Sequence, residues 1–391
     1  MKIIRYLFAT IVCIQVIAMV AFYMYMYIGH DNRILINSRQ ESNITTGTSL
    51  QMRTSADYME NSTKHVLLKN IRTSCSQLAF SFVSHITQPH FDNNNNTNLF
   101  LLVLVTSGVE KSYLTRRNSV RNTWGNEASH PASRDWKRVF LLGRIQSTEI
   151  DQESSEFNDI LVLNMTDNYN NLVIKVFSGL LWSMIHVNPH FILKADDDVY
   201  VRIPYLITWL ENYGGDTFYG GHVIPDGAEV NREVTWKNQI LKDCLAEDYF
   251  PPYCSGPFYV ISSSILPSLF QSVQNWTAFP AEDAYIGILA RENGLKPVSM
   301  PGFDLRQLKD YGKCTWASAI ALGHRFDLLE LSFVEKKLQE TSRLPRDYYK
   351  CLMNDWAVTI FLIIIPSITF VVAVTFVKLL SCQRSIAYPT S

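Results

Sequence analysis

The chain has 391 residues, of which 47% are hydrophobic and 18% are charged, and its formal net charge is −1. This length is sufficient for one large domain or two smaller ones, each with its own core. Nucleic-acid-binding proteins usually carry an excess or a stripe of lysine and arginine. The near-zero net charge and the absence of such a stripe give that class no support.

An uncharged run of 23 residues, 6–28, follows Lys2 and Arg5 near the start of the chain. As a helix it is long enough to cross a membrane. The apolar stretch is too long for a signal peptide and lacks a clear small-x-small cleavage site. The sequence therefore predicts an uncleaved signal anchor at 6–28.

A second uncharged run, of 21 residues, occupies 357–377 and is also followed by basic residues. We interpret it as a second membrane-spanning helix, because a polar tail after it argues against a cleaved lipid-anchor signal. The positive-inside rule then predicts that 1–5 and 378–391 are cytoplasmic tails and that 29–356 are lumenal.

Five of the seven cysteines fall in this lumenal segment, where disulfides persist. An odd number favours two disulfides and one free thiol, with the connectivity open. For Cys254 a disulfide half is favoured over a nucleophile. Five N-x-S/T sequons support a lumenal location only weakly: Asn43, Asn61, Asn95, Asn164 and Asn275.

Polar residues dominate 29–97, which predicts a mostly irregular lumenal stem. Beyond the stem, apolar runs of strand length alternate with stretches of helical length and spacing. The order is strand, helix, strand, strand, helix, strand, which is typical of a doubly wound α/β sheet. The expected strands are 99–106, 139–144, 159–165 and 191–195, and the expected helices are 113–125 and 171–187.

Three adjacent carboxylates, Asp196, Asp197 and Asp198, follow the last of these strands in "FILKADDDVYV". In α/β sheets of this kind, ligands bind beyond the carboxyl ends of the strands. Such a triplet alone is compatible with a solvated acidic loop. At a strand end it is better explained by a divalent cation with oxygen ligands, Mn²⁺ or Mg²⁺. No glycine-rich dinucleotide or P-loop motif is present.

Six motifs occur in the order found in one enzyme family. They are "RRNSVRNTWG" from Arg116, "VFLLGR", "EFNDILVLNMTDNYNNLVIK", "KADDDVYV", "YFPPYCSGPFYVIS" from Tyr249 and "EDAYIG" from Glu282. Together they resemble the β-1,3-glycosyltransferases that transfer galactose or N-acetylglucosamine from a UDP-sugar. The resemblance covers roughly 99–326, and a second membrane span would be unusual for that family.

The resemblance implies a GT-A fold, Golgi residence, a lumenal orientation and inversion at the anomeric carbon. We accordingly expect a catalytic domain at 98–335, followed by a lumenal connector at 336–356. The implied cofactor is Mn²⁺ or Mg²⁺. Asp198 is expected to bind the cation, His324 in "LGHRF" to complete its shell, and Asp196 to lie nearer the sugar or ribose of the donor, with Asp197 also contributing to the donor site.

Several further residues are expected around the donor nucleotide. Arg117 and Arg121 are expected to reach uracil, ribose or phosphate. Trp124 either packs behind the nucleotide or is a core residue. Lys175 and Lys194 would add positive potential near the diphosphate, or else be ion-paired or solvated lysines. Ser255 and Gly256 would let the backbone approach the donor closely.

An inverting transfer needs one carboxylate to accept the proton of the attacking hydroxyl. Asp283 is expected to be this base, with Glu282 orienting the acceptor or capping the following helix. The predicted reaction moves galactose from UDP-galactose to the 3-hydroxyl of a glycan on protein or lipid. UDP-N-acetylglucosamine as donor and a non-catalytic lectin or chaperone on the same fold stay as alternatives. Homo- or hetero-oligomers with other Golgi transferases are the protein partners considered.

Overall fold

The structure, a computed structural model, describes residues 81–91, 99–144, 148–225, 229–230, 245–276 and 278–342. Both predicted membrane spans, 6–28 and 357–377, and both predicted tails lie outside these residues. Of the predicted stem and connector, only 81–91 and 336–342 lie inside them. Among the helices that are described, none has the length and apolar character needed to cross a bilayer.

Within the described residues, the strands form one sheet of eight, in the order β1-β4-β3-β2-β5-β8-β7-β9, and a small sheet in the order β10-β11-β6. The strands of the large sheet are β1 (His85–Thr87), β2 (Leu101–Thr106), β3 (Trp136–Arg144), β4 (Ile160–Thr166), β5 (Phe191–Asp196), β7 (Tyr219–Ile224), β8 (Tyr253–Ser262) and β9 (Val298–Ser299). The small sheet contains β6 (Tyr200–Val201), β10 (Phe303–Asp304) and β11 (Ala321–Leu322).

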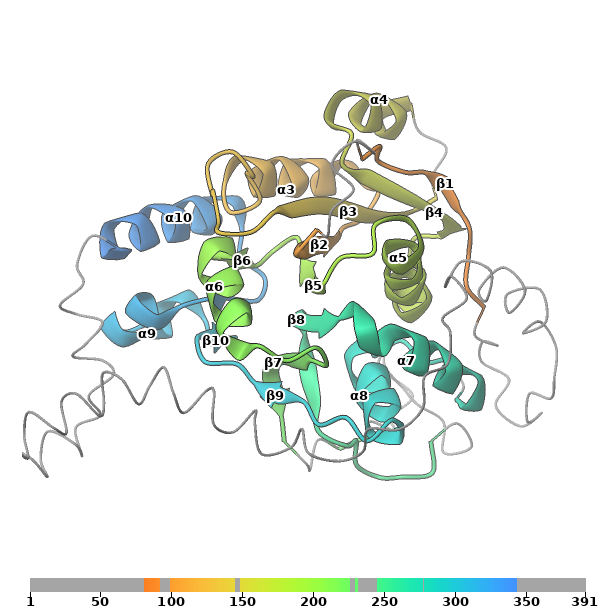
Figure 1. Cartoon of the computed structure of the whole chain (residues 1–391). Coiled ribbons are helices and arrows are strands. Elements are labelled where there is room, and N and C mark those ends of the chain that lie inside the picture. Colours follow the sequence, from red (N-terminus) through yellow and green to blue (C-terminus); the bar gives the residue numbers. More distant parts are fainter. Residues whose placement is uncertain are drawn as a thin grey trace, which may run out of the picture.

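Helices cover both faces of the large sheet (Figure 1). They are α3 (Lys111–Asn122), α4 (Thr148–Phe157), α5 (Leu172–His186), α6 (Ile203–Tyr213), α7 (Leu266–Ser272), α8 (Glu282–Glu292), α9 (Lys313–Ser318) and α10 (Leu328–Ser342). In Figure 1, α3, α6 and α10 lie to one side of the central strands, and α5, α7 and α8 lie to the other.

The core consists of two apolar layers, one on each face of the large sheet. Alternate residues of a strand point to opposite faces. Leu101, Val103 and Val105 of β2 accordingly belong to one layer, and Leu102 and Leu104 belong to the other. Every residue of β2 is buried. This explains why the strand reads as an unbroken apolar run rather than an alternating one.

Half of the large sheet is parallel, as the sequence predicted. β2 pairs in parallel with β3 and with β5, and β3 pairs in parallel with β4. The other half departs from a doubly wound parallel sheet, because β8 runs antiparallel to both β5 and β7. The predicted α/β class is therefore confirmed, with a mixed sheet.

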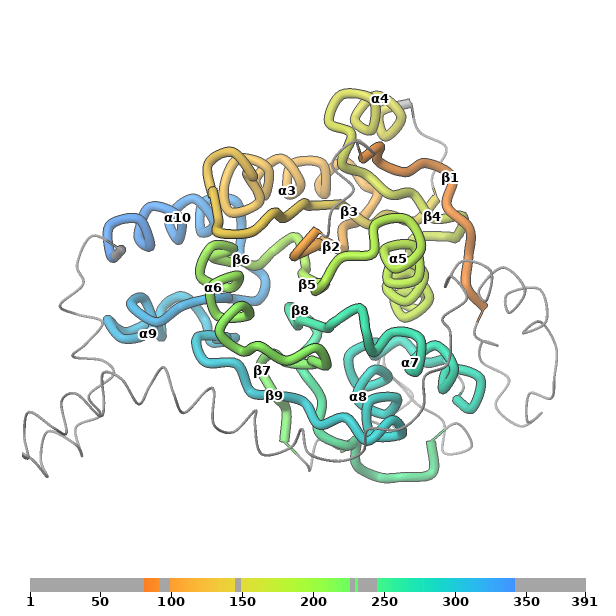
Figure 2. The backbone as a smooth tube through the Cα atoms, viewed as in Figure 1, coloured from red at the N-terminus to blue at the C-terminus, as the bar shows by residue number. Residues whose placement is uncertain are grey.

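Two elements were not predicted. α4 has the sequence "TEIDQESSEF" and buries little beyond Ile150 and Glu153, so no apolar periodicity marks it. β1 falls in the predicted stem but pairs antiparallel with β4, and Figure 2 shows it running along that edge. The folded domain thus begins before residue 98, and α10 carries it beyond 335 to Ser342.

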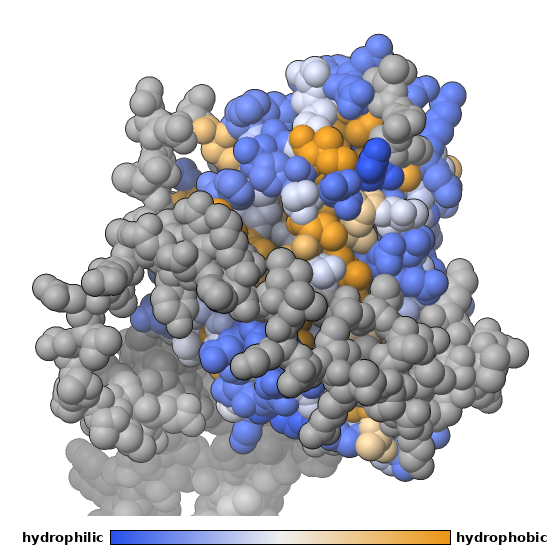
Figure 3. Space-filling model, turned by 90° about the vertical axis from the view of Figure 1, so that its right-hand side faces the viewer, coloured by the Kyte–Doolittle hydropathy of each residue, from blue (hydrophilic) through white to orange (hydrophobic). Residues whose placement is uncertain are grey.

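Figure 3 views the molecule from the side on which β1 and α4 lie in Figure 1. Hydrophobic side chains appear in the middle of an otherwise largely hydrophilic face. Exposed apolar residues of these elements include Ile86 of β1 and Phe157 of α4. Scattered exposed apolar residues are normal on a soluble domain.

Candidate active site

The acidic triplet lies where β2 and β5 end side by side. The two strands are parallel and in register, with Thr106 opposite Asp196, so both present their carboxyl ends at one edge. Thr106 Oγ1 donates a hydrogen bond of 2.5 Å to Asp196 Oδ1. Ser107 Oγ donates one of 2.7 Å to Asp197 Oδ2. These hydroxyls fix two of the three carboxylates, and no motif in the sequence marks either of them.

Asp198 is brought next to His324 by the small sheet. β6 begins two residues after Asp198 and pairs with β11, which ends just before Gly323 and His324. The backbone N–H of Phe326 donates to the carbonyl oxygen of Asp198 at 2.9 Å. Gly323 has φ +87°, and a Cβ there would lie 2.1 Å from the Phe326 ring, so this turn requires glycine.

The two oxygens of the Asp198 carboxylate differ. Oδ2 lies 3.1 Å from Arg116 Nη1, whereas Oδ1 is buried and has no hydrogen-bond partner. Burial raises the pKa of Asp198, and the neighbouring Asp196 adds to this, while Arg116, His324 and the backbone N–H of Arg325 oppose it. Burial also raises the pKa of Asp197, to about 6. A buried carboxylate oxygen without a partner is costly unless a cation meets it.

Asp198 and His324 offer one carboxylate and one imidazole to a metal ion. This donor set suits Mn²⁺, and the unpartnered Asp198 Oδ1 is the observation that supports it. Within the described residues, no group of three or more His, Cys, Asp or Glu side chains is arranged to hold a metal. Most of the coordination shell would therefore come from a ligand or water.

Glu282 and Asp283 begin α8, and their side chains have different surroundings. Asp283 Oδ2 accepts from the backbone N–H of Gly256 at 2.9 Å, and Oδ1 accepts from that of Ala284 at 2.9 Å. A Cβ at position 256 would lie 3.1 Å from Asp283 Oδ2, so the backbone of β8 approaches this carboxylate closely. Burial raises the pKa of Asp283 despite these two hydrogen bonds.

Lys194 connects the triplet with this second acidic pair. Its Nζ donates to Asp196 Oδ1 at 2.6 Å and to the Gly256 carbonyl at 2.5 Å, and it lies 3.1 Å from Glu282 Oε1. Burial lowers the pKa of Lys194, but Asp196 and Glu282 outweigh this effect and raise it above its usual value. The ammonium group is therefore the shared counter-ion of two carboxylates from distant parts of the sequence.

Glu282 is buried, with 2% of its surface exposed, and it also accepts from Tyr259 Oη at 2.9 Å. Burial raises its pKa to about 7, against the attraction of Lys194. This position gives no support to the predicted contact between Glu282 and the acceptor. Nor does Glu282 cap α8, whose N-cap residue is Ala281.

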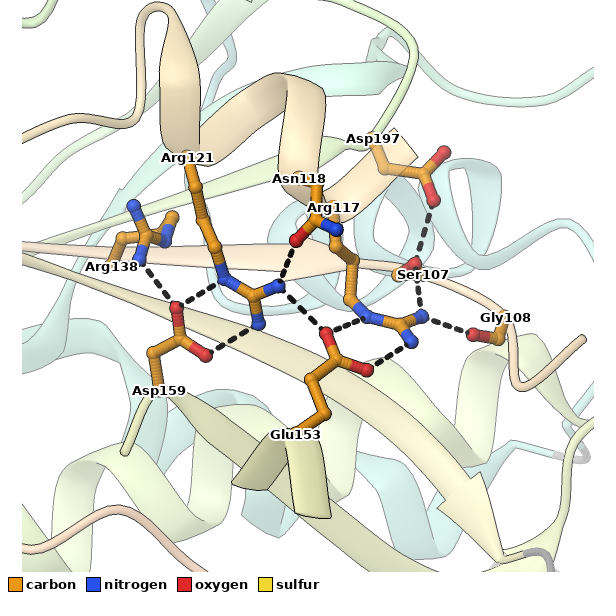
Figure 4. Close-up of polar contacts among 9 residues, drawn as sticks. All are labelled: Ser107, Gly108, Arg117, Asn118, Arg121, Arg138, Glu153, Asp159 and Asp197. Carbon is orange, nitrogen blue, oxygen red and sulfur yellow. Dashed lines mark hydrogen bonds and ion pairs between the residues drawn. The ribbon is translucent and has the colours of Figure 1, made fainter. Parts of the chain in front are cut away.

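The arginines of α3 separate into two environments. Arg117 is fully buried and binds Glu153 of α4 through two hydrogen bonds of 2.8 and 2.6 Å. Arg121 lies 2.7 Å from Glu153 and 2.8 and 2.9 Å from the two oxygens of Asp159. Figure 4 shows these side chains in one row, with Arg138 also bonded to Asp159.

This row reaches the acidic triplet at one end. Arg117 Nη1 donates to Ser107 Oγ at 3.2 Å, and Ser107 in turn donates to Asp197 (Figure 4). Arg117 and Arg121 are thus committed to partners within the protein, and this arrangement gives no support to their predicted contact with a nucleotide. Arg116, which is not among the predicted site residues, is the arginine of α3 that faces Asp197 and Asp198.

The structure also gives the surroundings of the remaining predicted site residues, Trp124, Lys175 and Ser255. Trp124 is fully buried in the apolar layer beside α3, in agreement with the core interpretation. Lys175 donates to the Ser107 carbonyl at 2.5 Å and to Asp167 at 2.9 Å, and burial lowers its pKa. It is therefore an ion-paired lysine one residue away from the triplet network. Ser255 lies on β8 beside Gly256 and is partly exposed.

The expectation that Cys254 is half of a disulfide is wrong. The residue is a free, fully buried thiol on β8, not a disulfide half. Burial raises the pKa of this thiol well above its usual value. The side chain belongs to the apolar layer on the α5 side of the sheet, where it packs as a small hydrophobic residue. Cys314, by contrast, is disulfide-bonded.

Glu153 should be a major contributor to stability, because it faces the guanidinium of Arg117. We expect Glu153→Ala to lower the free energy of unfolding by about 3–5 kcal/mol, since it leaves a buried charge without its partner. Glu156→Ala removes the same charge from an exposed position on α4 and should change stability by about 0.5 kcal/mol or less. Urea unfolding of both variants tests this. Equal midpoints would contradict it.

Comparison with known proteins relates the part of the chain that contains the triplet and Glu282–Asp283 to one enzyme family. A family model described as galactosyltransferase matches residues 115–301. An N-acetyllactosaminide beta-1,3-N-acetylglucosaminyltransferase 4 from Mus musculus is 30% identical over 242 residues, which cover 59% of this chain and 68% of that protein. A beta-1,3-galactosyltransferase 1 from Homo sapiens is 27% identical over 268 residues, covering 66% of this chain and 79% of that protein.

Among solved structures, the galactosyltransferase LgtC in complex with donor and acceptor sugar analogues is 12% identical and has a TM-score of 0.35, over 64% of this chain and all of that chain. This likeness is too distant to bear on function. The sequence matches define the class: the chain is a hexosyltransferase. It belongs to the galactosyltransferase family, which includes both β-1,3-galactosyltransferases and β-1,3-N-acetylglucosaminyltransferases.

Proposed function

We propose that this hexosyltransferase is an inverting β-1,3-galactosyltransferase with a GT-A-type site. It would transfer galactose from UDP-galactose to the 3-hydroxyl of a glycan on protein or lipid. One observation carries the proposal. Lys194 contacts Asp196 of the triplet, Glu282 beside Asp283, and the Gly256 carbonyl, which supports one site that would contain both the metal-binding triplet and the base Asp283.

The residues divide into two roles. Asp198 and His324 would hold Mn²⁺ or Mg²⁺, which when bound neutralises the diphosphate of the leaving UDP. Asp283 would accept the proton of the acceptor 3-hydroxyl as that oxygen attacks the anomeric carbon and the bond to UDP breaks. Its burial supports this role, because a raised pKa makes a carboxylate a better base near neutral pH. Its two oxygens keep lone pairs that can accept a proton, because a carboxylate has about four acceptor sites and the N–H groups of Gly256 and Ala284 use two of them.

UDP-N-acetylglucosamine is the alternative donor. The relatives at 30–31% identity are named as N-acetylglucosaminyltransferases, and those at 27% identity, which match over a longer stretch, are named as galactosyltransferases. Sugar pockets for the two donors differ by a few contacts to the C2 substituent. We favour galactose because the matching family model carries that description.

A donor panel tests the proposal directly. The purified chain is incubated with UDP-galactose or UDP-N-acetylglucosamine and a set of glycan acceptors, with Mn²⁺ or with EDTA, and released UDP is measured. We expect release with UDP-galactose that requires both acceptor and Mn²⁺. Release with UDP-N-acetylglucosamine alone would establish the alternative donor, and release unaffected by EDTA would contradict the metal site.

We further propose that the protein resides in the Golgi membrane with its catalytic domain in the lumen. The support is the pair of uncharged runs, 6–28 and 357–377, with basic residues on their outer sides. In sealed microsomes, protease should remove tags from both termini and leave the catalytic domain intact. A protected C-terminal tag would show that 357–377 does not span the membrane.

A further inference from the structure

Arg116 lies on the open side of the acidic triplet. Its Nη1 is 3.1 Å from Asp198 Oδ2 and 3.3 Å from Asp197 Oδ1. Its side chain is 40% exposed, whereas those of Arg117 and Arg121 are 0% and 7% exposed. Of the three arginines on α3, Arg116 is thus the one that touches the triplet and is also accessible to a ligand.

This contact places a positive charge on the carboxylate that would bind the metal. Asp198 has one oxygen without a partner and one engaged by Arg116. A divalent cation on Asp198 would stand close to the guanidinium, and the two like charges repel each other. A metal ion that binds without nucleotide therefore has to displace Arg116 or bind more weakly beside it.

We propose that Arg116 holds the place of the cation in the nucleotide-free enzyme and moves to the donor diphosphate when both ligands bind. This inference rests on the proposed function and adds a donor-binding residue to it. A guanidinium matches phosphate oxygens with a planar pair of N–H donors, which a lysine does not. When Asp198 binds the metal, the diphosphate replaces it as the negatively charged partner of Arg116.

The surroundings of Arg116 allow such a change. The guanidinium carbon of Arg116 lies 5.4 Å from the centre of the Tyr113 ring, one turn earlier on α3. The guanidinium therefore has an aromatic neighbour that does not belong to the triplet. Asp197 does not depend on Arg116 alone, because Ser107 donates to its other oxygen. The triplet can therefore release Arg116 without leaving Asp197 unpaired.

The proposal predicts that the binding of the metal and the binding of the nucleotide are thermodynamically linked. Each ligand should strengthen the binding of the other, and by reciprocity the two factors must be equal. Loss of Arg116 should then act in opposite directions on the two ligands. Metal binding without nucleotide becomes tighter, and UDP binding in the presence of metal becomes weaker. A residue with a purely structural role would not produce these opposite effects.

Three variants of the full chain test this: Arg116→Gln, Arg116→Lys and Lys111→Gln. Lys111 is exposed on the same helix, so its variant controls for the loss of one positive charge. Mn²⁺ affinity is measured by calorimetry without nucleotide, and UDP affinity is measured at saturating Mn²⁺. Circular dichroism confirms that each variant is folded.

For Arg116→Gln we expect Mn²⁺ alone to bind about 5- to 150-fold tighter than in the parent, the usual range of coupling between sites, and UDP to bind weaker by a similar factor. Arg116→Lys should bind Mn²⁺ alone as weakly as the parent and still lose UDP affinity. Lys111→Gln should match the parent in both measurements.

The inference is overturned if Arg116→Gln leaves either affinity unchanged while the parent shows Mn²⁺-dependent UDP binding. In that case the proposed function still stands. A parent that binds UDP without Mn²⁺ and transfers no sugar would instead overturn the proposed function. The two failures are therefore separate results of the same set of measurements.

Discussion

Asp198→Asn is expected to abolish sugar transfer and to weaken Mn²⁺-dependent binding of UDP by about 100-fold or more. If Asp198 binds the cation as proposed, the change replaces a charged ligand oxygen by a neutral amide, and the described residues contain no group of three or more His, Cys, Asp or Glu side chains that could hold the ion without it. Loss of even a supporting group around a metal costs about 10- to 100-fold in affinity or activity, and loss of the ligand itself should exceed that. Calorimetry with UDP, with and without Mn²⁺, measures the effect.

The fold should survive this substitution. The backbone bond from Phe326 to the Asp198 carbonyl does not involve the side chain, and Arg116 keeps its contact with Asp197. Asp216→Asn, at an exposed position, is the matched control and should bind UDP as the parent does. If Asp198→Asn retained the parent's Mn²⁺-dependent UDP affinity, Asp198 would not be the metal ligand.

Asp283→Asn should reduce the transfer rate by about 10²- to 10⁴-fold, the usual contribution of a positioned acid or base. UDP binding with Mn²⁺ should stay near that of the parent, because Asp283 lies on α8 and not in the triplet. The amide has a single acceptor oxygen, whereas the carboxylate accepts from two backbone N–H groups. A small loss of stability is therefore also expected, and thermal unfolding measures it separately.

The pH dependence supplies a second test of the base. Asp283 must be unprotonated to accept a proton, and burial raises its pKa in the folded protein. Activity should therefore be present at high pH and fall as the pH decreases through this raised pKa. The acidic limb of kcat/KM should lie above the ordinary range of an aspartate. A near-parent transfer rate in Asp283→Asn would falsify the assignment, whatever the pH profile.

Much of the fold could be predicted because the parallel strands are buried on both faces. Such strands read as unbroken apolar runs, and β2, β3, β4 and β5 all coincide with predicted ones. The polar helix α4 could not be found in this way, because its main buried contact is the ion pair of Glu153 with Arg117 rather than an apolar face. Strand direction in β8 also depends on partners that no local pattern reports.

The triplet, Asp283 and Lys194 could be selected from motifs, but their contacts could not. The arginines illustrate the difficulty, because Arg116 and Arg117 are adjacent in sequence and point in different directions on α3. One faces the open triplet, and the other faces buried Glu153. Only the rotation of the helix about its axis decides between them. Ser107 was missed for a similar reason, since a single serine after a strand carries no chemical signal.

Lys194 also determines how substitutions in the site combine. One ammonium group contacts Asp196, Glu282 and the Gly256 carbonyl, so a change in any of them alters the electrostatic environment of the others. Free-energy changes at residues that share a partner are not additive, and their interaction energies are about 0.5–3 kcal/mol. Substitutions of Asp196 and of Glu282 therefore have to be interpreted as pairs rather than one residue at a time.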